Sequence, residues 1–147
     1  MNILNDFTET LNDLMTERNI KAIDLANALG LGTSTLSHYT RGQRLPNLEC
    51  LVKLADYFQC STDYLLRLEE DNSTTQFLPC PPFSERLAYL LDYFKVSASS
   101  VYKNENISKA RFFVWKNGTG QPNVYNLVCL AKIFNCSVDF VIGRSKS

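Results

Sequence analysis

The chain has 147 residues, with 15 Lys plus Arg and 15 Asp plus Glu, so its formal net charge is zero. This balance excludes a strongly cationic protein that coats nucleic acid without sequence preference. Hydrophobic residues make up 45% of the chain, which also has six Gly and five Pro. The composition is that of a globular chain, in one ordinary domain or two small ones.

Apolar side chains at helical spacing predict that the chain begins with a helix. Its buried stripe comprises Phe7, Leu11, Leu14 and Met15. Gly30 is suited to end a short second helix, because glycine readily adopts the left-handed conformation. The inward residues of that helix are Leu25, Ala26 and Leu29. A third helix is predicted over about Thr33 to Thr40, ending at Gly42.

Asn47 and Ser61 are predicted to cap a fourth and a fifth helix, because their side-chain oxygens can accept free N–H groups of a first turn. The predicted buried face of the fourth helix comprises Leu48, Leu51, Val52, Leu54, Ala55 and Phe58. The fifth helix is predicted to face inward through Tyr64, Leu65 and Leu66.

The sequence repeats itself at an offset of 76 residues. Residues 7–66 then lie on residues 83–142 without a gap, and about 16 of 60 positions are identical. We therefore predict two copies of one small domain, residues 1–68 and 83–145. The linker between them, residues 69–82, is first polar and then rich in Pro, which blocks helix continuation.

The second copy predicts the same five helices. Its candidate caps are Ser97, Ser108, Asn123 and Ser137. Asn106 stands in the place of Gly30 and still tolerates the left-handed conformation. No segment shows sustained alternation with period two, so the predicted fold class is all-α, without a sheet.

Three segments of the first copy resemble one family. They are Leu25-Ala26-x-x-Leu29-Gly30-Leu31, Leu36-Ser37-x-Tyr39-x-x-Gly42-x-x-x-Pro46 and the run from Leu51 to Leu66. Their order is similar to that of the phage-repressor-like (Xre) helix-turn-helix DNA-binding domains. The resemblance covers about 60 residues in the first copy and, more weakly, about 60 in the second. It implies two tandem five-helix, lambda-repressor-like helix-turn-helix domains.

The resemblance implies that the third helix enters the major groove of double-stranded DNA. Its base-reading candidates are Thr33, Ser34, Ser37 and His38. Its phosphate-binding candidates are Lys21, Arg41, Gln43 and Arg44. Leu36 and Tyr39 are expected to point into the core. Neither copy has the glutamine that usually begins the family's second helix, and Lys21 replaces that contact only as a point charge.

In the second copy Lys109 and Arg111 are the base-reading candidates, and Lys116 and Asn117 the phosphate candidates. Phe113 and Val114 occupy the positions of Ser37 and His38, which are expected to face outward. Two interpretations stay open for these apolar side chains. They contact thymine methyl groups, or they form a protein interface.

The zero net charge is the sum of two unequal halves. Residues 1–70 carry six Lys or Arg and ten Asp or Glu, whereas residues 71–147 carry nine and five. The basic copy either grips the DNA backbone or attracts the acidic copy within or between chains. Two arrangements on DNA stay open. One chain acts as its own pseudo-dimer, or two chains form a homodimer through their second copies.

The leading hypothesis is a repressor-like transcriptional regulator of bacterial or phage type. The rival is an antitoxin-like regulator whose main partner is a protein. No catalytic constellation, cofactor motif or metal spacing is present, since the five Cys lack Cys-x-x-Cys spacing and His38 is the one histidine. The thiols are expected to be reduced and mostly buried. We expect no signal peptide, no membrane span and a cytoplasmic location.

Overall fold

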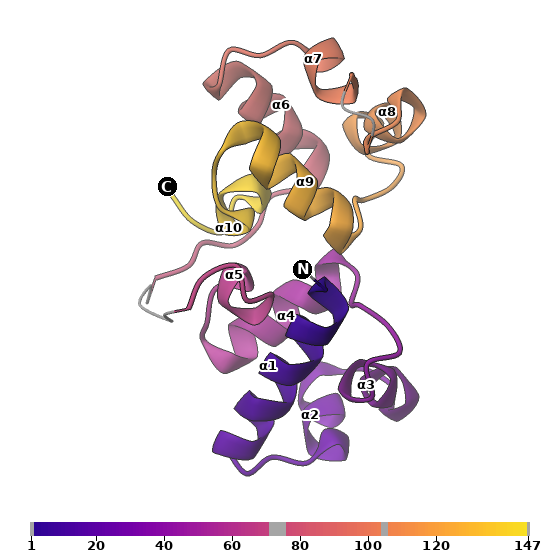
Figure 1. The fold of residues 1–147 in the computed structure, drawn as a ribbon, viewed down its shortest axis with the longest axis vertical. Helices are drawn as coiled ribbons and strands as arrows, with labels where there is room; N and C mark the ends of the chain where they lie inside the picture. Colours follow the sequence, from indigo (N-terminus) through magenta and orange to yellow (C-terminus); the bar gives the residue numbers. More distant parts are fainter. Residues whose placement is uncertain (1, 71–75, 104–105, 147) are drawn as a thin grey trace. The chain divides into compact units, whose positions relative to one another are not determined.

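The computed structural model describes residues 2–70, 76–103 and 106–146. All regular elements within these ranges are helices, which confirms the predicted all-α class. The chain divides into two compact units, Met1–Thr75 and Gln76–Ser147 (Figure 1). None of the helices in the described ranges is long and apolar enough to cross a membrane.

Five helices form the described part of the first unit. They are α1 (Ile3–Glu17), α2 (Ala22–Leu29), α3 (Thr33–Thr40), α4 (Leu48–Phe58) and α5 (Thr62–Leu65). The predicted signals act where the sequence places them. Gly30 ends α2 at φ 68°, and the side chains of Asn47 and Ser61 accept the N–H groups of Cys50 and Tyr64 at 2.8 Å each.

The core of the first unit is built from the predicted apolar faces. Phe7, Leu11, Leu51 and Phe58 are all at most 1% exposed. Three expectations were wrong in degree, because Leu29, Val52 and Tyr64 are only half-buried. Helical spacing alone does not distinguish a covered position of an apolar face from a partly covered one.

Five helices also form the described part of the second unit. They are α6 (Phe83–Tyr93), α7 (Ala98–Tyr102), α8 (Lys109–Asn117), α9 (Val124–Phe134) and α10 (Val138–Ile142). The helices α7 to α10 each begin 76 residues after α2 to α5. The four predicted caps, Ser97, Ser108, Asn123 and Ser137, each accept a backbone N–H group.

The second unit departs from the first near its start and around α7. The helix α6 begins only after Pro82, because Pro79, Pro81 and Pro82 precede it. The helix α7 ends at Tyr102, so Asn106 does not directly terminate it as Gly30 terminates α2. Residues 104 and 105, between them, lie outside the described ranges.

Equivalent aromatic positions make equivalent contacts in the two units. Phe7 meets Tyr39 edge to face at 6.0 Å between ring centroids, and Phe83 meets Trp115 in the same way at 6.3 Å. The guanidinium of Arg18 lies over Phe58, and the ring of Phe94 stacks on Phe134 in the corresponding place. Equivalent pairs of positions therefore join equivalent helices in the two units, through different side chains.

The second unit is closed by a buried ion pair. Arg144 is fully buried and donates to Asp139 at 3.0 Å, and its guanidinium lies 3.8 Å from the ring centroid of Phe77. The N–H of Leu78 donates to the carbonyl of Arg144 at 2.8 Å. Phe77 and Leu78, from the segment predicted as linker, thus pack with the second unit.

All five cysteines are free thiols. Cys50 and Cys60 are buried, whereas Cys80, Cys129 and Cys136 are half-buried, so fewer are buried than the sequence led us to expect. Burial raises the pKa of the Cys129 thiol, and the charge of Lys132 partly opposes this shift. Since thiolate is the reactive form, this shift makes Cys129 a weaker nucleophile than an unperturbed cysteine.

Candidate nucleic-acid interface

The helix α3 has one anchored face and one polar face. Leu36 is completely buried and Tyr39 is 3% exposed, so both point into the core as expected. The predicted base readers lie on the remaining surface. Thr33 and Ser34 are exposed, whereas Ser37 and His38 are half-buried. The N-terminal turn of α3 is therefore the most accessible part of the helix.

The helix α1 holds the C-terminal end of α3. The side-chain amide of Asn12 donates to the carbonyl oxygens of Thr40 and Thr8, at 3.0 Å each. Gly42 follows at φ 72°, and a Cβ atom there would lie 3.4 Å from the hydroxyl of Thr8. Together with the contact between Phe7 and Tyr39, these bonds fix the position of α3 within the first unit.

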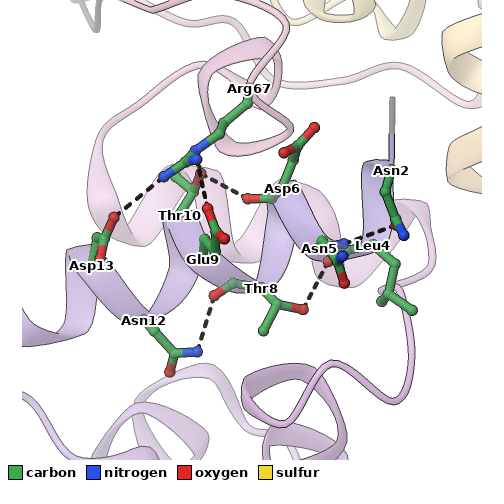
Figure 2. Close-up of polar contacts among 10 residues, drawn as sticks. All are labelled: Asn2, Leu4, Asn5, Asp6, Thr8, Glu9, Thr10, Asn12, Asp13 and Arg67. Atoms are coloured by element: carbon green, nitrogen blue, oxygen red, sulfur yellow. Dashed lines mark hydrogen bonds and ion pairs between the residues drawn. The ribbon is translucent and has the colours of Figure 1, made fainter.

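The opposite side of α1 carries the acidic residues. Figure 2 shows Thr8 and Asn12 on one side of this helix, and Glu9, Thr10 and Asp13 around Arg67 on the other. Arg67 donates to Glu9 at 2.7 Å and to Thr10 at 3.0 Å. A cavity of about 370 Å³ lies on that side, lined by Thr10, Asp13, Glu17, Tyr64, Arg67, Glu69 and Glu70. Much of the negative charge of the first unit is thus kept away from the side of α1 that holds α3.

Tyr39 links α3 to α4 and to the loop after α3. Burial, followed by a hydrogen bond with Cys50, raises the pKa of the Tyr39 phenol far above its usual range. The positive charge of Arg44 opposes this shift, which places that guanidinium within electrostatic reach of Tyr39. The phenol therefore stays protonated at any physiological pH and serves as a neutral anchor.

The loop that leaves α3 presents polar and cationic side chains to solvent. Arg41, Gln43 and Arg44 are all exposed. The backbone N–H of Arg41 donates to the carbonyl of Ser37, and that of Gln43 donates to the carbonyl of His38 at 2.9 Å. The loop backbone is thus ordered, while the three side chains remain accessible. Lys21, also exposed, stands at the N-cap of α2 without a capping side-chain bond.

One atom of the polar face of α3 is unsatisfied. Nδ1 of His38 is buried and has no hydrogen-bond partner within the described ranges. A buried polar atom without a partner costs free energy. Since Nδ1 is enclosed, any contact that the imidazole makes with an outside molecule falls to its other nitrogen, Nε2.

The helix α8 of the second unit is anchored in the same way but has a different outer surface. Phe112 and Trp115 are at most 2% exposed. Phe113 and Val114 are 36% and 41% exposed, so they face outward as the sequence predicts. The remaining candidates, Lys109, Arg111, Lys116 and Asn117, are all exposed.

Sequence analysis missed the residues that position α3 rather than touch a ligand. Asn12 and Thr8 lie inside α1, where asparagine and threonine are weak helix formers. The presence of these weak helix formers inside a helix was the sequence signal that could have identified the two residues. Arg67 adopts φ 57°, and no motif in the sequence indicates its contacts with α1.

Residues 11–65 match the helix-turn-helix family model HTH_3. The match runs from within α1 to the last residue of α5. The first unit thus contains a helix-turn-helix domain of the Xre type, and its turn joins α2 to α3. The match does not extend to the second unit, whose helix-turn-helix assignment stays a prediction.

Proteins with regulatory names resemble part of the chain. The phage repressor named "Cryptic phage CTXphi transcriptional repressor RstR", from Vibrio cholerae, is 32% identical over 66 residues. The "HTH-type transcriptional regulator AnsR" of Bacillus subtilis (strain 168) is 36% identical over 66 residues. Each match covers 45% of this chain, and the chain spans 60% and 57% of those relatives. None of the solved structures gives a significant match.

Proposed function

We propose that the first unit binds double-stranded DNA by inserting α3 into the major groove, and that the chain is a repressor-like transcriptional regulator. The observation that carries this proposal is the construction of α3. Buried Leu36 and Tyr39 fix the helix, Asn12 ties down its end, and a polar face is left outside. The regulatory names of the relatives support the same function.

Base contacts fall to the polar face of α3. Thr33 and Ser34 carry short hydroxyls that bond several bases and so discriminate weakly. Ser37 adds a third hydroxyl. His38 is the strongest candidate for discrimination, because an imidazole nitrogen makes one directional bond to a base edge. Its Nε2 is the contacting atom, since Nδ1 is enclosed.

Phosphate contacts fall to the residues that flank the helix. Arg41, Gln43 and Arg44 leave α3 exposed, and the planar guanidinium groups match phosphate oxygens in geometry and charge. Lys21 supplies a point charge at the start of α2. These four contacts would orient the domain on the duplex without reading its sequence.

The second unit is proposed to be a diverged helix-turn-helix domain, which makes the molecule a tandem pair joined through the predicted linker. Lys109 and Arg111 would contact bases, and Lys116 and Asn117 would contact phosphates. The alternative is that Phe113 and Val114 form a protein interface, either in a homodimer or with an antitoxin-like partner. Their exposure is what favours this alternative. Neither function needs a cofactor, a metal ion or catalysis.

Selection of bound duplexes from a random library tests the proposal. We expect a defined site whose affinity falls steeply as salt rises, because each phosphate contact releases counterions. Failure to bind any duplex, or an affinity that does not change with salt, would contradict DNA binding and favour the protein partner.

Gel-shift titration of Phe113→Asp separates the two geometries. A charge at this position disrupts a dimer made through the second units, and binding to a palindromic site then weakens. A monomer that still binds with the affinity of the unmodified chain would contradict the dimer.

A further inference from the structure

The outer surface of α8 combines apolar and cationic side chains. Phe113 and Val114 lie exposed beside Lys109, Arg111 and Lys116. The equivalent surface of α3 has no Lys or Arg and no exposed apolar side chain. The outer surface of α8 therefore carries two apolar side chains and three positive charges, whereas that of α3 is rich in hydroxyl groups.

The two apolar side chains are held in place. The ring of Phe113 packs edge to face on buried Phe112, at 5.6 Å between centroids, and lies 6.0 Å from Tyr102. Val114 is confined by the turn after the helix, because a Cβ atom on Gly120 would lie 2.7 Å from its Cγ1. Ordered side chains lose little conformational entropy when a ligand covers them.

The charge around these side chains favours nucleic acid over protein as the partner. The sequence between Tyr93 and Asp139 carries six Lys or Arg and a single carboxylate, Glu105, which lies outside the described ranges. The core of a protein–protein interface is depleted of charged residues. A polyanion instead gains a favourable contact from each exposed cation.

The apolar group that a major groove offers is the 5-methyl group of thymine. We propose that Phe113 and Val114 contact thymine methyl groups, with Lys109, Arg111 and Lys116 around them on the same duplex. The second unit then selects thymine at one or two positions of the site. This inference rests on the proposed function, since it requires α8 to enter a major groove.

Replacing thymine by deoxyuridine tests the inference, because this change removes the methyl group and keeps the hydrogen-bonding edge. The full chain is titrated with its selected duplex and with duplexes that carry one deoxyuridine each. We expect an affinity loss of about fourfold at one or two positions, the amount that follows from one buried methyl group. Phe113→Ala and Val114→Ala should bind more weakly and lose this sensitivity at their respective positions.

Matched variants make the outcome specific. Ser37→Ala, at the equivalent position of the first unit, should keep the sensitivity to deoxyuridine. Val114→Thr keeps the side-chain shape, and the fluorescence of Trp115 next to it reports whether the unit remains folded. Loss of sensitivity in a folded variant then reflects the lost contact.

Two results would overturn the inference, and they differ from failure of the proposed function. An unchanged affinity for every deoxyuridine duplex, with Phe113→Ala altering the oligomeric state, would make this surface a protein interface. The second result is a double variant, Lys109→Ala with Arg111→Ala, that binds DNA with unchanged affinity. The second unit would then not contact the duplex, and the proposed role of α3 would stand. Binding to no duplex at all would contradict both proposals.

Discussion

Positive charge lies in different places around α3 and α8. No Lys or Arg occurs within Thr33–Thr40, and Arg41 and Arg44 follow directly. In the second unit Lys109, Arg111 and Lys116 lie within the helix, and residues 117–123 contain no charged side chain. One scaffold thus carries two arrangements. The first separates a helix surface without Lys or Arg from cationic flanks, and the second places Lys and Arg beside apolar side chains on the helix itself.

The two helices are also held differently at their C-terminal ends. In the first unit Asn12 bonds the last carbonyl of α3, whereas the equivalent position in α6 is Ala88. A small hydroxyl residue packs against the following glycine in both units, Thr8 against Gly42 and Ser84 against Gly118. Both units therefore share the packing contact with the glycine. The first unit also has the directional hydrogen bond from Asn12, which Ala88 cannot supply in the second unit.

The largest expected effect concerns the arginine ion pairs of the two units. Arg144→Ala leaves the carboxylate of Asp139 buried without its cation, which should destabilise the second unit by about 3–5 kcal/mol. Arg67→Ala removes partly exposed ion pairs and should cost the first unit about 1 kcal/mol or less. Urea unfolding monitored by Trp115, which lies in the second unit, measures the first effect directly. Equal shifts in the two variants, measured by circular dichroism, would contradict the contrast.

The next effect concerns the turn after α8. Gly120→Ala places a Cβ atom 2.7 Å from Cγ1 of Val114, and Val114 is stiff because it is β-branched. We expect a loss of about 1–3 kcal/mol of stability in the second unit. Combination with Val114→Ala should restore most of it. Gly32→Ala is the control, because its nearest contact there is an ordinary 3.7 Å. No rescue by Val114→Ala would show that another contact limits this turn.

A smaller effect is expected at the bond that ties down α3. Asn12→Ala removes the donor to Thr40, and its loss should cost about 1 kcal/mol, the usual contribution of one hydrogen bond. Denaturant unfolding measures this cost. The reverse change, Ala88→Asn, is the matched experiment in the second unit. If Asn12→Ala left both stability and DNA affinity unchanged, the bond would have no role in positioning α3.

The sequence predicted most of what depends on local signals. The caps at Asn47, Ser61, Asn123 and Ser137 and the end of α2 at Gly30 all lie where local rules place them. These features depend on a few neighbouring residues, so spacing and residue type are enough.

Contacts between distant residues could not be predicted in this way. The bond between Asn12 and Thr40 and the approach of Arg67 to Glu9 join residues far apart in the sequence. Arg144 illustrates the difficulty most clearly. Arginine is usually solvated, yet Arg144 is fully buried against Phe77 and Asp139.

The central claim is a division of labour in the first unit, with His38 reading a base and Arg44 holding a phosphate. The most direct test is the affinity of the unmodified chain, Arg44→Ala and His38→Ala for the selected duplex and all its single-base variants, at several salt concentrations. Arg44→Ala should weaken binding to every duplex by the same factor and reduce the salt slope by about one. His38→Ala should abolish discrimination at one base pair, and His38→Gln, whose amide lies near the place of Nε2, should retain part of it. Equal losses on every duplex for both alanine variants would contradict the assigned roles.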